Sequence, residues 1–93
     1  MFVRKVSVQY HAEGSLQPCP MKWLDNFAMR SFTNDVMFDD TLPVSDGLLE
    51  VGTRVTLNRL QEAMEDWFRK KSYLPGESSL VVEEIAPAQK SVR

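Results

Sequence analysis

His11 is the one histidine of the chain and the first residue to consider for chemistry. Imidazole accepts and releases a proton near neutral pH more readily than other side chains, so a histidine near a carboxylate is a candidate general base. His11 follows Tyr10 and lies two residues before Glu13. These three residues form our candidate ligand-binding site, and His11 is the only candidate for catalysis. The alternative is a histidine solvated at a strand end, because no spacing in the sequence gives His11 a positioned partner.

A second candidate is an acidic stretch, since no Lys or Arg occurs between Arg30 and Arg54. The acidic residues in this stretch are Asp35, Asp39, Asp40, Asp46 and Glu50. The last four are the candidate partner-binding residues, because a local negative field can attract a basic protein. Asp39 and Asp40 could also hold a divalent cation, although their spacing does not match a calcium-binding loop. The alternative is a solvated edge whose charges discourage sheet edges from pairing.

The single cysteine, Cys19, excludes several other chemistries. One thiol cannot form a disulfide within the chain or complete a cysteine-based zinc or iron–sulfur site. Cys19 lies between two prolines, where a thiolate can be presented to a partner but where inert loop thiols also occur. The four glycines are scattered, so they predict neither a phosphate-binding loop nor a dinucleotide motif. We therefore expect no metal site and no cofactor.

Composition bounds the remaining possibilities. The 93 residues carry 13 acidic and 11 basic side chains, for a formal net charge of −2. A weakly acidic chain lacks the basic surface that binds nucleic acid or anionic lipid. No apolar run has the length of a membrane span, and charges interrupt the N-terminal residues where a signal peptide would be apolar. We therefore expect a cytoplasmic domain with a protein partner or self-association, and with no nucleic acid or membrane partner.

Four segments have the patterns of strands. Residues 2–10 alternate between apolar and polar types, as in a half-buried strand, and residues 48–55 do the same. The Asp46–Gly47 turn signal joins the second of these to an irregular edge strand within 36–45. A short apolar run predicts a last strand at 80–85. Residues 11–19 are expected to be a connection.

Two segments have the spacing of amphipathic helices. The first begins at Pro20, whose missing N–H suits the first turn, and ends near Asn34. In the second, Thr56 is the predicted N-cap, with Val55 before it for a hydrophobic staple. Its apolar stripe consists of Leu57, Leu60, Met64, Trp67 and Phe68.

The predicted order is strand, helix, strand, strand, helix, strand. It is the βαββαβ order of ferredoxin-like domains, so we expect an α+β two-layer sandwich with a four-stranded antiparallel sheet and two helices on one face. We assign residues 1–86 to this single domain and residues 87–93 to a polar tail. RNA-recognition domains share the element order, but they carry stacking aromatics on their central strands. None of the outward positions predicted for the first and third strands of this chain is aromatic; they are Lys5, Ser7, Gln9, Glu50, Gly52 and Arg54.

Fold alone does not fix function, and the chain offers no catalytic set. The first hypothesis is therefore a small non-catalytic module that binds a protein, or a second copy of itself, through a sheet edge or the acidic hairpin. The alternative is a small-molecule-binding protein or enzyme with a cleft near Tyr10 and His11, formed within a dimer. The two differ in geometry, since a cleft would bring His11 within reach of Glu13, an Asp or a Tyr.

Overall fold

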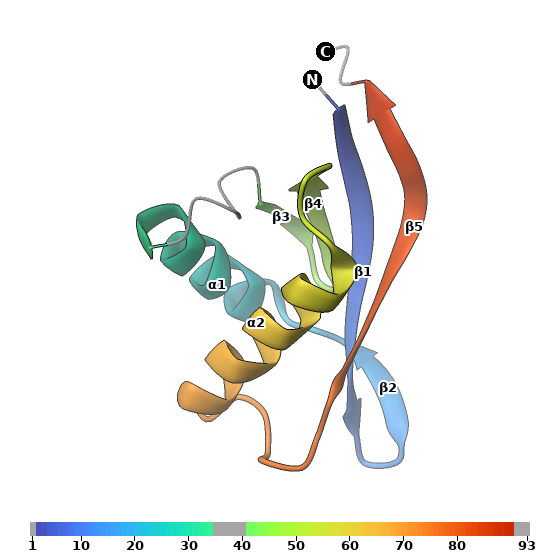
Figure 1. The fold of residues 1–93 in the computed structure, drawn as a ribbon. Coiled ribbons are helices and arrows are strands. Elements are labelled where there is room, and N and C mark those ends of the chain that lie inside the picture. The colour runs from blue at the N-terminus through green and yellow to red at the C-terminus, as the bar shows by residue number, and fades with distance from the viewer. Residues whose placement is uncertain (1, 35–40, 91–93) are drawn as a thin grey trace.

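The computed structural model describes residues 2–34 and 41–90 (Figure 1). In these ranges the chain forms five strands and two helices. Their order is β1 (Phe2–Ala12), β2 (Ser15–Pro18), α1 (Met21–Asn34), β3 (Leu42–Ser45), β4 (Leu48–Gly52), α2 (Leu57–Lys70) and β5 (Leu80–Lys90). The fold is therefore α+β, as the sequence predicts, but the sheet has five strands instead of four.

Strand β1 is the centre of an open, antiparallel sheet. It pairs with β5 along Phe2–Tyr10, with β4 along Val3–Ser7 and with β2 along Gln9–Ala12. Because β5 overlaps both of the others in register, β5 takes one edge of β1, and β4 and β2 follow one another along the opposite edge. Strand β3 then pairs with β4 at the outside of the sheet.

Both helices lie on the same side of this sheet (Figure 1). The core fills the space between the two layers. The sheet contributes alternate residues of β1 and β4 to the core, such as Val6, Val8 and Leu49, and the helices contribute Phe27 and Phe68. All five side chains have no exposed surface. The predicted stripe of α2 is confirmed as a core face, since Leu60, Met64 and Phe68 are fully buried. Neither helix is long and apolar enough to cross a membrane.

The N-terminus of α2 confirms the predicted cap. The Thr56 side-chain oxygen accepts a hydrogen bond from the Arg59 backbone N–H at 3.3 Å, which satisfies one of the free donors of the first turn. Val55 is only 3% exposed and belongs to the same core as Leu60, as a hydrophobic staple requires. Two basic residues, Arg69 and Lys70, occupy the last turn and complement the helix dipole there.

The segment 11–19 differs from its prediction as a connection. Strand β1 continues to Ala12 and forms a hairpin with β2. The two turn residues, Glu13 and Gly14, both have positive φ angles, 53° and 83°, as a tight two-residue hairpin turn requires. Glutamate rarely takes this conformation, so the residue types at positions 13 and 14 do not predict the turn.

Strand β5 also differs from its prediction. It extends to Lys90, whereas the apolar run predicts an end at residue 85. The added part includes residues 87–90 of the segment assigned to a polar tail. Its backbone pairs with β1, with Lys90 opposite Phe2, so long-range pairing rather than local periodicity determines where this strand ends. Strand β4 ends earlier than predicted, at Gly52.

Candidate functional site

The structure does not bring Tyr10 and His11 together. Successive residues of a strand point to opposite faces, and the Tyr10 ring packs on the helix side, 4.7 Å from the centroid of Trp23. His11 is exposed, lies on the other side opposite Leu16, and makes no side-chain hydrogen bond or ion pair with the described residues. Glu13 is exposed in the hairpin turn. The geometric condition for a cleft around these residues is therefore not met within one copy.

Tyr10 instead belongs to an aromatic cluster that joins β1 to the two helices. Trp23 of α1 stacks on Tyr73, with 5.1 Å between ring centroids and 7° between ring planes. Phe68 of α2 lies 5.5 Å from Trp23 and meets Phe27 edge to face at 6.5 Å. Such geometries add to the stabilisation from burial alone. The cluster therefore accounts for Tyr10 as a packing residue.

The acidic candidates have separate surroundings. Asp39 and Asp40 lie outside the described residues. Asp46 accepts a hydrogen bond from the Met21 backbone N–H at 2.7 Å, so its carboxylate caps the N-terminus of α1. Glu50 is half-buried on β4, directly opposite Lys5 of β1. Within the described residues no group of three or more potential metal ligands occurs.

Cys19 is fully buried, and its burial raises the pKa of the thiol to about 12. The protonated form is therefore the stable one at neutral pH, which removes the reactivity that depends on a thiolate. Its backbone closes a three-way junction. The Cys19 N–H donates to the Val8 carbonyl at 3.0 Å, the Val8 N–H donates to the Gly47 carbonyl at 2.9 Å, and the Gly47 N–H donates to the Cys19 carbonyl at 2.6 Å.

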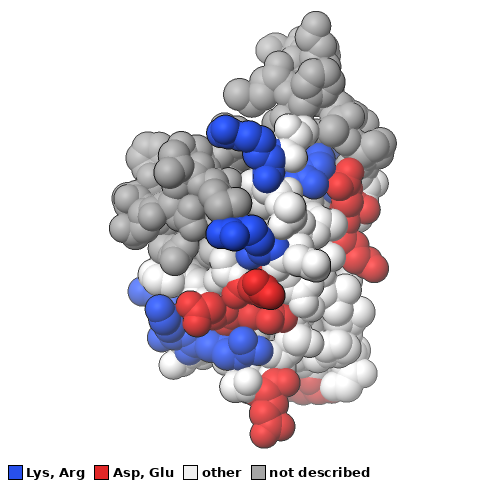
Figure 2. Space-filling model, in the orientation of Figure 1, with Lys and Arg blue, Asp and Glu red and all other residues white. Residues whose placement is uncertain are grey.

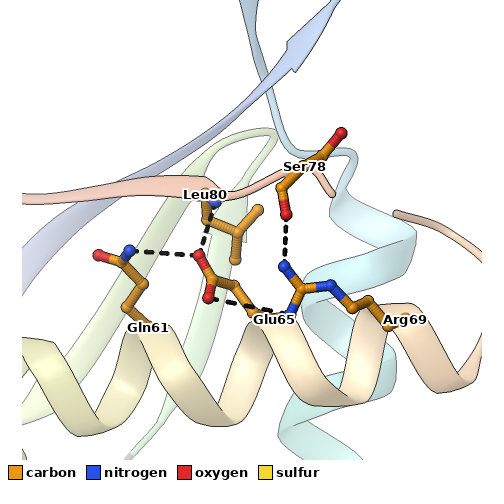
Figure 3. Close-up of polar contacts among 5 residues, drawn as sticks. All are labelled: Gln61, Glu65, Arg69, Ser78 and Leu80. Atoms are coloured by element: carbon orange, nitrogen blue, oxygen red, sulfur yellow. Dashed lines mark hydrogen bonds and ion pairs between the residues drawn. The ribbon is translucent and has the colours of Figure 1, made fainter. Parts of the chain in front are cut away.

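A polar network on α2, which the sequence analysis did not anticipate, fixes the start of β5 (Figure 3). The Glu65 carboxylate accepts hydrogen bonds from the Leu80 N–H at 2.9 Å and the Gln61 amide at 3.2 Å. It also pairs with Arg69 at 4.0 Å, and the Arg69 guanidinium donates to the Ser78 carbonyl. Because these partners lie in the α2–β5 connection and in β5 itself, the network is structural.

Arg4 makes a comparable connection at the other end of the sheet. Its guanidinium donates to the carbonyls of Gly52 and Val55 and forms an ion pair with Glu84 at 3.6 Å. The side chain is 14% exposed, so these contacts are largely shielded from water. In the sequence Arg4 only interrupts the alternation of β1; in the structure it joins β1 to β5 and to the link between β4 and α2.

Among the described residues, no helix covers the face of the sheet opposite α1 and α2 (Figure 1). Residues opposite one another in antiparallel strands point to the same face of the sheet, and successive residues of one strand point to opposite faces. The buried residues of β1 mark the covered face, so each neighbouring residue can be assigned to one face or the other. We define the open face as Lys5, Ser7, Gln9, Leu42, Leu48, Glu50, Val81 and Glu83. Leu42 is 59% exposed, and Leu48 and Val81 are half-buried.

The edges of the sheet are less suited to binding than this face. Each edge strand contains a proline: Pro18 in β2, Pro43 in β3 and Pro87 in β5. Proline has no N–H to donate to an added strand, and prolines and charges on edge strands discourage edge-to-edge pairing. Strand addition is therefore disfavoured at all three.

Neither family models, nor characterised proteins, nor solved structures gave a match to this chain.

Proposed function

We propose that this chain is a small, non-catalytic protein-binding module that binds through the open face of its sheet. The observation that carries the proposal is the placement of both helices on one side (Figure 1), so that no described helix covers the other side. That side presents Leu42, Leu48 and Val81 among charged residues. Mixed apolar and polar surface of this kind is typical of protein interfaces that also exist exposed to water.

The acidic hairpin contributes to this proposal through one residue. Glu50 lies on the open face, whereas the Asp46 carboxylate is already used to cap α1. The charges elsewhere give less guidance, because Figure 2 shows acidic and basic side chains mixed over the surface that includes α2. A partner is therefore better matched to the open face than to the hairpin turn.

We also propose that the fold is a ferredoxin-like domain with a hairpin inserted after its first strand. Without β2, the elements have the order βαββαβ, and the pairings β5–β1, β1–β4 and β4–β3 support the strand order of that fold. The inserted hairpin extends β1 beyond the sheet proper and adds the fifth strand. This proposal concerns architecture alone, since such folds host unrelated functions.

Site-specific photo-crosslinking tests the binding surface. A photoreactive phenylalanine analogue replaces Leu42 on the open face in one variant and Met29 on α1, which is 61% exposed, in a matched control. Irradiation of living cells should yield a discrete protein adduct from position 42 and none of comparable intensity from position 29. Equal adducts from both positions, or none from position 42, would contradict the proposal.

A further inference from the structure

We propose that the protein bound at the open face is a second copy of this chain, packed sheet to sheet about a two-fold axis. This inference rests on the proposed function and names its partner. A two-fold arrangement presents the same surface on both copies, so that surface must be complementary to itself. The distribution of charge, the apolar content and the size of the open face each bear on this requirement.

The open face carries charges of both signs. Lys5 lies directly opposite Glu50, and Glu83 lies opposite Ser7 on the other flanking strand. Among the described residues, nevertheless, neither carboxylate forms an ion pair with the Lys5 ammonium. A uniformly basic partner would meet one like charge in this set, and a uniformly acidic partner would meet two. A second copy related by two-fold symmetry can place each Lys5 near a carboxylate of the other copy.

The residues between these charges are neutral. Ser7 lies opposite Leu48 on one side and Glu83 on the other, and Gln9 lies opposite Val81. The Ser7 hydroxyl already donates to the Glu83 backbone carbonyl at 3.5 Å. Burial of Leu48 and Val81 against another copy removes apolar surface from water. Glu83 lies beside Ser7 on the edge strand β5 and is exposed, so water can still reach its carboxylate.

The open face is small. Strands β1 and β5 pair over roughly 30 Å, whereas β4 and β3 are about half as long, so at about 4.8 Å per strand the face covers roughly 450 Å² per copy. Stable dimers bury about 800 Å² per partner, so an interface of this size is typical of weak, reversible association. We therefore expect a reversible dimer with a dissociation constant in the micromolar range.

Sedimentation velocity across about three decades of protein concentration tests this proposal. The mass should rise from 10.7 kDa to twice that value. Lys5→Glu should weaken the dimer by about tenfold or more, and so should Glu50→Lys, because each puts like charges against one another across the axis. The double variant Lys5→Glu/Glu50→Lys should recover most of the affinity. Lys22→Glu, an exposed change on α1, is the matched control and should have no effect.

Circular dichroism and thermal melting of each variant show whether it is folded, so loss of the dimer through unfolding can be recognised. Lys5 and Glu50 also lie opposite one another within one copy, so each single change puts like charges side by side in the monomer, and only variants that melt like the parent chain are compared. A chain that stays monomeric throughout the series would overturn the proposal, as would a dimer that is insensitive to Lys5→Glu. If such a monomer still forms an adduct with a different protein at position 42, only the identity of the partner is wrong, and the proposed function stands.

Discussion

The two faces of one sheet differ sharply although the same strands supply both. On the covered face, Val6, Val8 and Leu49 have no exposed surface. One residue further along the same strands, the side chains of Lys5 and Glu50 point to the side without helices. The covered face therefore stabilises the fold, and the open face is free to carry charges that a core could not hold.

Substitutions on the covered face should therefore affect folding, and substitutions on the open face should affect association. A change on the covered face removes contacts that exist in every copy. A change on the open face removes contacts that exist only when a partner is present. Four substitutions, in order of decreasing effect on the free energy of unfolding, show which contacts stabilise the single copy.

Phe68→Ala should lower the free energy of unfolding by about 3–5 kcal/mol. The ring is fully buried and packs against Trp23, Phe27 and Tyr73, so its loss leaves a cavity in the aromatic cluster. Leu42→Ala on the open face is the control and should cost less than about 0.5 kcal/mol. Urea denaturation of both variants measures the difference. Similar losses would show that the two faces are not distinct.

Glu65→Ala should lower the free energy of unfolding by about 2–4 kcal/mol, because it leaves the Leu80 N–H without its acceptor and Arg69 without its counter-ion (Figure 3). Asp66→Ala is the control, one residue along the same helix. Its ion pair with Lys70 joins side chains that are 66% and 65% exposed, so its removal should cost less than about 0.5 kcal/mol. Thermal denaturation of the two variants measures the contrast, and equal shifts would contradict a structural role for Glu65.

Gly47→Ala should lower the free energy of unfolding by about 1–3 kcal/mol. A Cβ atom there would lie 2.6 Å from the Cβ of Pro18, at a φ of +71°. Gly14→Ala, with a φ of +83° and no atom within 4 Å of its Cβ, isolates the backbone effect and should cost less. Chemical denaturation should rank the two variants in this order. The reverse ranking would mean that the junction at Gly47 is not tightly packed.

Ionisation of the Cys19 thiol has the smallest effect on the free energy of unfolding near neutral pH. Its pKa is raised from 9.0 to about 12 in the folded chain, so the unfolded chain loses this proton at a lower pH than the folded chain does. The contribution to stability is complete below pH 9 and is lost as the pH rises towards 12. Cys19→Ala should therefore lose less stability than the parent chain between pH 9 and 11, as measured by urea denaturation. Equal losses would indicate an accessible thiol.

Local patterns predict the parts of this fold that local interactions determine. The alternation of β1 and the staple at Val55 are examples, since each depends on residues close in the sequence. The β1–β2 hairpin could not be predicted in the same way, because its turn needs a positive φ at Glu13, a conformation that glutamate rarely adopts. The partners of Glu65 are similarly distant, with Leu80 brought to α2 by the tertiary structure.

The candidate site was predictable to a smaller extent. We grouped Tyr10 and His11 because they are adjacent in the sequence. Strand β1 continues past Tyr10, however, and successive residues of a strand point to opposite faces, so the two side chains lie on opposite sides of the sheet. The outward positions Lys5, Ser7, Gln9 and Glu50 were predicted as such, and they now belong to the open face. That Lys5 and Glu50 form no ion pair with one another among the described residues could be seen only in the structure.

Methyl NMR over a dilution series tests directly whether the open face binds a second copy of the chain. If it does, the methyl resonances of Leu42, Leu48 and Val81 shift with concentration along one binding curve, while those of the core residues Leu49 and Leu60 stay fixed. Concentration-dependent shifts on the helices instead, or none at any methyl group up to about 0.5 mM, well above the micromolar dissociation constant expected for an interface of this size, would contradict this binding.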